Sequence, residues 1–324
     1  MQRKTFGQWL AVLSMSVLIP ASSSFADTFP SRAVSIIVPF SVGGSTDLVA
    51  RLVASGMGEQ GTETIVDNRT GGGGVIGWNT VARAKPDGYT LLTTEMSYAI
   101  AASLVPNLPF DPKKSLQQIT IAASVPHVLV VNPAVKAKTV QEFIDLAKAN
   151  PGKFFYGSGG TGTNTHLGGA LFNSLAGVEL VHVPYRGAGA ALKDLIAGET
   201  QALITSIPTA LPYIRSGQLR ALLVTSEDKV SVLPDVPSAP EVGMPKMVMK
   251  FWIGFAAPEG TPAPIMDRLN KDLVATVNSP EIKKRLIEQG LDPVGSTAQQ
   301  ATQLLDDEIE RWREVIQAAG IKPN

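Results

Sequence analysis

Short apolar runs alternate with helical patterns along the first third of the chain. The apolar runs, which favour strands, lie at 33–40, 62–67 and 89–94. Segments with helical spacing lie between them at 47–57 and 75–84. Strands that alternate with helices are typical of a parallel sheet whose faces are covered by helices.

A second series of the same kind occupies the middle of the chain. We expect helices at 139–149, 164–176 and 188–197, and strands at 153–156, 178–183, 200–205 and 219–225. The segment 119–132 joins the two series, and the chain returns through a second β-rich segment at 248–257. Helices at 262–278, 280–289 and 298–319 complete the pattern.

Two connecting segments predict two lobes and a hinge. We expect an α/β fold, a two-lobed clamshell in which each lobe is a mostly parallel sheet flanked by helices. Lobe 1 is discontinuous and comprises 27–124 plus 250–324, and lobe 2 comprises 125–249. Because only a few backbone torsions in the two crossovers need to change, such lobes can close on a ligand.

The first 26 residues have the pattern of a signal peptide. Arg3 and Lys4 precede the apolar run 9–19, and Ser24-Phe25-Ala26 has the small residues that a signal peptidase recognises. The run is much shorter than the roughly 20 residues that a membrane-spanning helix needs. We therefore expect export, cleavage after Ala26 and a soluble periplasmic protein.

Charge and cysteine content narrow the function. The chain has 28 Lys and Arg against 28 Asp and Glu, and cleavage after Ala26 removes two basic residues, which leaves 26 against 28, a net charge of −2. This balance gives no reason to expect nucleic acid or an anionic membrane surface as partner. Cysteine is absent, which excludes disulfides, a thiolate nucleophile and cysteine-based metal sites.

Two strand-to-helix turns contain the candidate ligand contacts. The start of a helix offers unpaired N–H groups and a positive dipole end, which suit a carboxylate or phosphate, and glycines let a ligand approach the backbone. Ser45 or Thr46 acting only as a helix cap is the alternative, but a cap does not require the preceding glycines. The first turn comprises Phe40, Ser41, Val42, Gly43, Gly44, Ser45, Thr46 and Asp47. The second comprises Ser158, Gly159, Gly160, Thr161, Gly162 and Thr163, with His166 one helical turn beyond.

Other glycine and histidine patterns carry less weight. The cluster 71–74 is either a flexible approach to the next helix or a ligand contact. Gly157, Gly159 and Gly162 form a G-x-G-x-x-G pattern, but the next strand does not end in the acidic residue that a dinucleotide fold requires. His127, His166 and His182 lack ligand spacing and favour structural roles. Because nucleophile-elbow, phosphate-loop and H-E-x-x-H motifs are missing, we expect no enzyme, metal or cofactor.

The chain resembles the extracytoplasmic receptors of tripartite tricarboxylate transporters, the Bug receptors, over nearly all of its length after residue 32. The motifs that carry the resemblance are Val38-Pro39-Phe40 with Gly43-Gly44 and Asp47, Val66-Asp67-Asn68-Arg69, Pro86-Asp87-Gly88-Tyr89-Thr90-Leu91, Val130-Val131-Asn132-Pro133, Tyr156-Gly157-Ser158, Gly162-Thr163 with His166-Leu167, Val181-His182-Val183-Pro184-Tyr185, Leu233-Pro234-Asp235-Val236-Pro237 and Pro293-Val294-Gly295-Ser296. The resemblance implies a periplasmic binding protein clamshell whose two glycine turns hold a carboxylate through backbone N–H groups and hydroxyls.

Several positions depart from the pattern of that family. Ser41-Val42 replaces the usual proline and glycine, and Thr205 stands where an aspartate is common. Loss of that carboxylate favours a plain or aromatic carboxylate over an acidic amino acid. Glu95 and Lys250 are also unusual. They either face the cleft, where they bracket a ligand or form an ion pair on closure, or lie solvated at its lip. Glu95, Ser97 and Thr205 complete the candidate contacts.

The function that the resemblance implies is capture of a di- or tricarboxylate or an aromatic acid. The receptor would deliver this ligand to the membrane permease subunits of the transporter, and we expect it to be a monomer. A receptor that reports the same ligand to a signalling partner is the alternative, and an enzyme using the same cleft is a weaker one.

Overall fold

The computed structural model describes residues 29–318. The predicted signal peptide and its cleavage site lie outside the described residues. No helix in the described part of the chain has the length and apolar character needed to cross a membrane.

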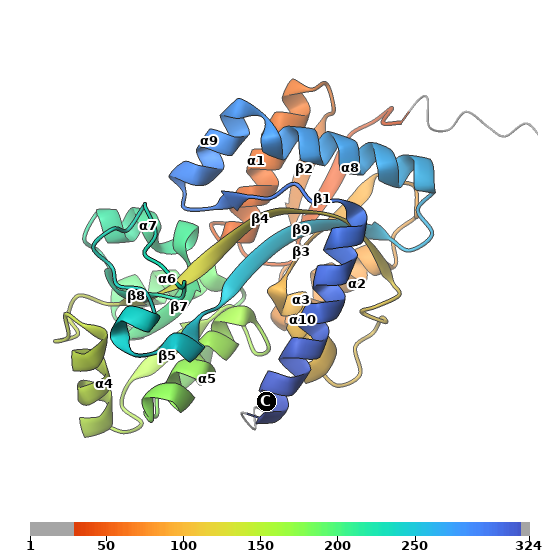
Figure 1. Cartoon of the computed structure of the whole chain (residues 1–324). Helices are drawn as coiled ribbons and strands as arrows, with labels where there is room; N and C mark the ends of the chain where they lie inside the picture. Colours follow the sequence, from red (N-terminus) through yellow and green to blue (C-terminus); the bar gives the residue numbers. More distant parts are fainter. Residues whose placement is uncertain (1–28, 319–324) are drawn as a thin grey trace, which may run out of the picture.

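The described residues form an α/β structure with one mixed sheet (Figure 1). The strands are β1 (Val34–Val38), β2 (Thr64–Asn68), β3 (Thr90–Glu95), β4 (Leu116–Val131), β5 (Phe155–Ser158), β6 (Val181–Pro184), β7 (Ala202–Ser206), β8 (Arg220–Val224), β9 (Lys250–Pro258) and β10 (Asp292–Pro293). The α-helices are α1 (Ser45–Glu59), α2 (Val75–Ala82), α3 (Met96–Leu104), α4 (Val140–Ala149), α5 (Asn164–Ala176), α6 (Ala188–Ala197), α7 (Ile207–Arg215), α8 (Ala263–Asn278), α9 (Pro280–Glu288) and α10 (Ala298–Ala318). Short 3-10 helices are η1 (Gly72–Gly74), η2 (Pro240–Val242) and η3 (Pro245–Met247).

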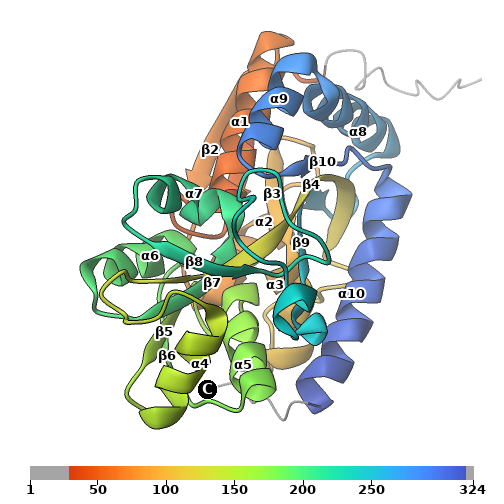
Figure 2. The same cartoon turned by 60° about the vertical axis from the view of Figure 1, so that its left-hand side comes forward.

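The long strand β4 connects two parts of the sheet. Residues 116–126 of β4 pair with β9. Residues 127–131 pair with β7 on one side, and residues 128–131 pair with β8 on the other. We call β1, β2, β3, β9 and β10 the first half of the sheet, and β5 to β8 the second half. In Figures 1 and 2, β4 and β9 run together from one half toward the other.

The expected α/β fold is confirmed, but its sheet is mixed. Between the named strands of the described chain, β1 pairs in parallel with β2 and β3, and β5 pairs in parallel with β6 and β7. The pairs that involve β4 or β9 are antiparallel. The reason is the return of the chain, because β9 runs back between β3 and β4.

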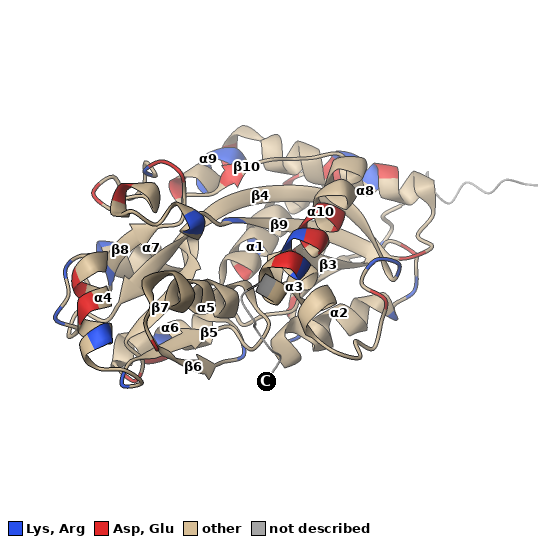
Figure 3. Ribbon diagram, turned by 60° about the horizontal axis from the view of Figure 1, so that its bottom comes forward, with Lys and Arg blue, Asp and Glu red and all other residues tan. Residues whose placement is uncertain are grey.

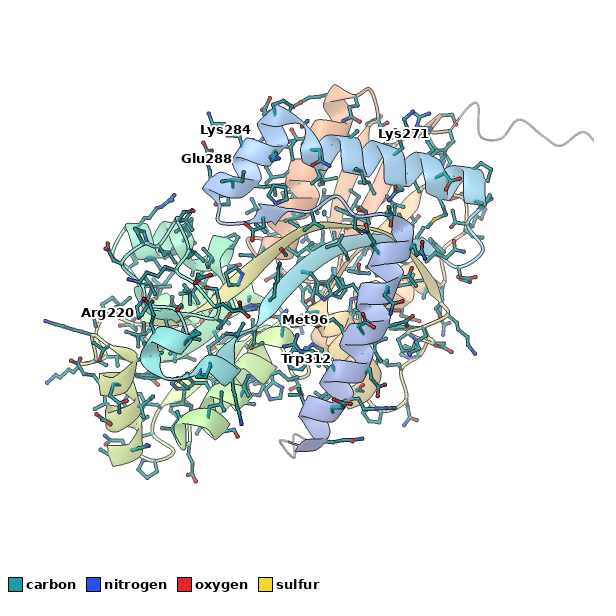
Figure 4. All side chains as sticks on the ribbon, viewed as in Figure 1. Met96, Arg220, Lys271, Lys284, Glu288 and Trp312 are labelled. Carbon is teal, nitrogen blue, oxygen red and sulfur yellow. The ribbon has the colours of Figure 1, made fainter. Side chains whose placement is uncertain are left out.

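Helices cover the sheet with their apolar faces, as their residue spacing predicts. In α4, Val140, Phe143, Ile144 and Ala147 are buried, which is the i, i+3, i+4, i+7 pattern of one helix face. The helix α10 packs along α3 and β4. Met96, at the start of α3, and Trp312, on α10, are both buried and are labelled in Figure 4. Charged residues lie on the outer helices, including α4, α8, α9 and α10 (Figure 3).

The bounds expected for α5 and α6 match the structure, whereas α3 and α7 were not expected. The helix α3 follows β3 with no intervening turn, and Glu95 both ends the strand and caps the helix. In α7, Pro208 lies in the first turn and Pro212 inside the helix. A prediction that relies on turn residues and on uninterrupted apolar periodicity therefore does not find these two helices.

Gly254 provides a test of packing at the centre of the sheet. It lies in β9 between β3 and β4, and a Cβ at this position would lie 2.7 Å from the carbonyl oxygen of Thr120. We predict that Gly254→Ala lowers the free energy of unfolding by about 1–3 kcal/mol, because overpacking displaces the backbone of β4. Urea unfolding measures the change.

The matched control is Gly58→Ala in α1. A Cβ on Gly58 would meet no atom within 4 Å. This change should raise the free energy of unfolding by up to about 1 kcal/mol, because alanine is the better helix former. Equal effects of the two substitutions would contradict the packing argument.

Candidate functional site

A small cavity, the cleft cavity, lies between the two halves of the sheet. Its volume is about 30 Å³. Its lining consists of Phe40, Gly44, Ser45, Thr46, Ser97, Gly159, Thr163, Asn164, Thr165, Ala188, Thr205, Ser206 and Phe251. Both predicted glycine turns therefore reach the same cavity, from strands that belong to different halves.

The first turns of several helices meet at this cavity. Strands β1, β3, β5, β6 and β7 are each followed by the helix whose start reaches the cavity, namely α1, α3, α5, α6 and α7. Ser45, Ser97, Asn164 and Ala188 lie in the first turns of α1, α3, α5 and α6, and Ser206 caps α7. Ligands in α/β folds bind outside the carboxyl ends of the strands, where helix N-termini provide N–H groups and positive dipole ends.

Most residues that line the cavity are polar or glycine, and none of them is charged. Among residues 29–318, no Lys, Arg, Asp, Glu or His side chain lines it. The N–H groups of Thr46 and Thr165 have no acceptor in the described chain, and the buried Thr205 hydroxyl has no partner there. Phe40 and Phe251 provide apolar surface. Such a site offers neutral hydrogen-bond donors to an anion.

Loops from the two halves touch each other around the cavity. The N–H of Ser45 donates to the hydroxyl of Thr209, 3.1 Å away. A Cβ on Gly73 would lie 2.6 Å from the carbonyl oxygen of Thr161, and Gly187 packs directly against Ser41. The glycine cluster 71–74 therefore contacts the second glycine turn and does not line the cavity.

A buried hydrogen-bond network under the cavity joins the halves through Asn164. The Asn164 amide nitrogen donates to Glu95 Oε2 at 2.8 Å and to Ser97 Oγ at 3.0 Å, and the Asn164 backbone N–H also donates to Ser97 Oγ. The Asn164 amide oxygen lies 2.9 Å from His127 Nε2. Because that oxygen can only accept, His127 carries its proton on Nε2 in this arrangement.

Burial shifts the pKa values of both ends of this network. Desolvation raises the pKa of Glu95 to about 7, although hydrogen bonds from Ser97 and Asn164 oppose the shift. Desolvation lowers the pKa of His127 to about 4, against the opposing effect of its hydrogen bond with Asn164. The neutral forms of both side chains therefore fit this structure best.

Part of the predicted set lines the cavity. These residues are Phe40, Gly44, Ser45, Thr46, Ser97, Gly159, Thr163 and Thr205. The remaining predicted contacts do not line it in this conformation: Ser41, Val42, Gly43, Asp47, Glu95, Ser158, Gly160, Thr161, Gly162 and His166.

Most of the residues that do not line the cavity hold the turns in place. Asp47 accepts hydrogen bonds from Gly43 N, Arg51 and Asn68. His166 Nδ1 accepts from Gly162 N, and its ring stacks on His182 at 4.1 Å. Val42 differs, because it is 63% exposed on the outer side of its turn.

Sequence reasoning missed Asn164, Thr165, Ala188, Ser206 and Phe251. Asn164 and Thr165 directly follow the second glycine turn. They would have been predicted if the candidate set had included the first residues of the helix after that turn. Ala188 follows Gly187 at the start of another helix, which is the same local signal. The positions of Ser206 and Phe251 depend on α7 and on the register of β9.

The structure does not bring Glu95 and Lys250 together at the cleft cavity. Glu95 is fully buried and bonded within the network, so it is not solvated at the lip either. Side chains alternate along a strand. In β9, Phe251 reaches the cleft cavity, and its neighbour Lys250 is exposed and lines pockets that do not include the cleft residues.

A sequence profile described as the tripartite tricarboxylate transporter family receptor matches residues 49–321. The protein BugT of Bordetella pertussis is 37% identical over 300 residues, which cover 92% of each chain. The chain belongs to this receptor family. No group of His, Cys, Asp and Glu residues suited to a metal ion occurs within the described chain.

Solved structures of related proteins have the same fold. A protein from R. palustris solved with adipate is 33% identical and has a TM-score of 0.88, with 91% of this chain and 100% of that chain covered. MatC from Rhodopseudomonas palustris with bound malate is 31% identical and has a TM-score of 0.85, with 89% and 100% covered. Two proteins similar to this chain have thus been solved with a dicarboxylate.

The buried carboxyl group of Glu95 makes stability depend on pH. A folded-state pKa of about 7, above the usual 4.5, means that Glu95 stabilises the fold fully below about pH 4.5 and that this contribution is lost as pH rises through 7. We predict that Glu95→Gln, which keeps an acceptor for Ser97 N, is more stable than the unmodified protein at pH 8 by about 3 kcal/mol.

The same pair of proteins at pH 4.5 provides the control. Their free energies of unfolding in urea should differ there by less than about 1 kcal/mol, because Glu95 is protonated in the folded state and about half protonated in the unfolded state. A difference that stays constant from pH 4.5 to pH 8 would show that Glu95 does not titrate as its burial implies.

Proposed function

We propose that this chain is a periplasmic solute-binding receptor that captures a small carboxylate and delivers it to the permease subunits of a tripartite tricarboxylate transporter. Membership of the receptor family supports this function. Malate and adipate in related structures support the class of ligand.

The observation that carries the proposal is the set of helix starts around an uncharged cavity. A carboxylate there would accept hydrogen bonds from the N–H groups of Thr46 and Thr165 and from the hydroxyl of Thr205. Each helix dipole contributes about 0.3–1 kcal/mol at an exposed site and up to about 2 kcal/mol when partly buried. Several such contributions stabilise an anion without an arginine, and neutral donors keep the ligand releasable.

We further propose that capture requires movement of two lobes, 27–124 with 250–324 against 125–249. The cleft cavity of about 30 Å³ is far smaller than the roughly 300–1,000 Å³ of typical small-molecule sites. A dicarboxylate therefore enters when the loops that carry Ser41 and Gly187, and Gly73 and Thr161, move apart. The hinge lies where β4 changes from pairing with β9 to pairing with β7 and β8.

Thr205 restricts the class of carboxylate. Its hydroxyl is buried at the cavity wall and has no partner in residues 29–318. A neutral donor here accepts a ligand carboxylate and offers no negative charge to an ammonium group. The proposed ligands are therefore plain or aromatic carboxylates rather than acidic amino acids.

Thermal unfolding in the presence of candidate acids tests the proposed function. Malate, adipate and benzoate are suitable probes, and we expect at least one to raise the melting temperature. A ligand at 100 times its dissociation constant stabilises the folded state by about 2.7 kcal/mol. Failure of every carboxylate, together with stabilisation by a neutral solute, would contradict the proposal.

A matched pair of variants locates the effect at the cavity. Thr205→Asp places a negative charge against the ligand, so we predict that it removes the thermal shift. Thr205→Asn has nearly the same volume without charge and should retain most of the shift. Loss of binding in both variants to the same extent would mean that shape, and not charge, determines recognition at position 205.

A further inference from the structure

A second and larger pocket lies on the opposite side of β9 from the cleft cavity. We call it the rear pocket. Its volume is about 590 Å³, within the roughly 300–1,000 Å³ of typical small-molecule sites. It is lined by Ile121, Ser124, Lys250, Trp252, Val294, Gly295, Ser296, Gln300, Leu304, Glu308 and Arg311.

Two buried polar atoms of the rear pocket lack partners. The indole Nε1 of Trp252 and the hydroxyl of Ser124 make no hydrogen bond within residues 29–318. Trp252 is 3% exposed and Ser124 is 4% exposed. An indole N–H is only a donor, and leaving it buried without an acceptor is costly. Both residues line the rear pocket, and because neither atom is exposed, an acceptor bound there would reach them after a shift of the lining side chains.

Strand pairing places these donors side by side with a cation. Ser124 of β4 is directly opposite Trp252 of β9 in the antiparallel ladder, so both side chains lie on the same face of the sheet. Lys250 lies two residues before Trp252 and therefore shares that face. Lys250 is exposed and forms no ion pair within the described part of the chain.

Glu308, the acidic residue that lines the rear pocket, already has partners for both of its carboxylate oxygens. Glu308 Oε1 pairs with Arg311 at 3.1 Å, and Glu308 Oε2 accepts the indole N–H of Trp312 at 2.8 Å. Lys250 thus remains as the uncompensated charge, and the pocket has a net charge of +1 from Lys250, Arg311 and Glu308. One negative charge on a ligand would balance it, whereas a second would face Glu308.

Apolar side chains form the remainder of the wall. Ile121 and Leu304 line the pocket from β4 and α10, and Val294 is 42% exposed at its edge. These surfaces suit a hydrocarbon group. The pocket therefore combines donors and one free cation with an apolar wall.

We propose that the rear pocket is a second binding site, which takes a small amphipathic monocarboxylate. The carboxylate accepts hydrogen bonds from Trp252 Nε1, Ser124 Oγ and Lys250, and the hydrocarbon group packs on Ile121 and Leu304. The site is independent of the proposed cleft site, because Lys250 and Trp252 point away from the face on which Phe251 lines the cleft cavity.

The indole N–H resonances of Trp78, Trp252 and Trp312 report occupation of the rear pocket directly. Hexanoate is the probe, titrated into ¹⁵N-labelled protein, with Trp252→Phe to assign the resonance. We expect a saturable shift of the Trp252 resonance alone, since Trp312 already donates to Glu308 and Trp78 does not line the rear pocket. Hexanamide, which lacks the charge, should give at most a weak shift, and adipate should shift it less than hexanoate.

Exposed lysines provide a matched pair of variants. Lys250→Gln should weaken hexanoate binding about tenfold, the usual effect of losing a charge-assisted hydrogen bond. Lys246→Gln alters an exposed lysine that does not line the pocket, and it should leave the affinity unchanged. The dissociation constants come from the Trp252 titration and from calorimetry.

Two results would overturn the proposal. The first is a Trp252 resonance that does not move at saturating hexanoate while the protein remains folded. The second is a response that Thr205→Asp abolishes and Lys250→Gln does not change, because hexanoate would then act through the cleft. Retention of the response in Thr205→Asp supports the rear pocket, whatever the fate of the cleft proposal.

Discussion

The antiparallel pairing of β4 with β9 is the constraint on which the rest of the structure depends. The two strands pair from Leu116 with Pro258 to Pro126 with Lys250, and β4 then continues into the second half of the sheet. This continuity places the carboxyl ends of β1 and β3 opposite those of β5, β6 and β7. The helix starts that follow these strands consequently meet at one cavity, although they come from distant parts of the sequence.

The charge distribution at the cavity follows from this arrangement. Helix N-termini supply partial positive charge, so the lining needs no basic side chain. The acidic Glu95 lies behind Ser97 and Asn164, where desolvation raises its pKa to about 7. Its proton therefore reduces the negative charge beneath the proposed carboxylate site. Both buried groups need a hydrogen-bond partner, and Asn164 supplies one to each. Its amide nitrogen donates to the carboxyl of Glu95, and its amide oxygen accepts from the imidazole of His127.

Much of the fold was predictable from local signals. The helices α5 and α6 follow glycine turns and keep a regular apolar face, and glycines at 177 and 198 end them. These signals gave the α/β class, both glycine turns and the two crossing segments. The helices α3 and α7 were not predictable in this way. Glu95 caps α3 without a preceding loop, and Pro212 interrupts the spacing of α7, which only tertiary packing stabilises.

Of the residues that line the cleft cavity, those within the two glycine turns or next to them were predictable from the sequence. Ser45, Thr46, Gly159 and Thr163 follow from the turns themselves, whereas Ser206 and Phe251 depend on which strands are neighbours. Lys250 shows the limit most clearly. From Phe251 to Pro258 both faces of β9 are buried, so the strand lacks the alternation that would reveal which side chains face the cleft.

The register of β9 therefore decides what each of its residues does. Glu95 pairs with Ile253, which places it on the face of Phe251 and away from that of Lys250 and Trp252. A shift by one residue would exchange these faces, bringing a lysine to the cleft and an aromatic ring to the rear pocket. The bulges in β4 near Thr120 and Ala123, with Gly254 opposite them, fix the alignment. The lining of both proposed sites thus depends on strand register as much as on the glycine turns, and only the turns are visible in a single sequence.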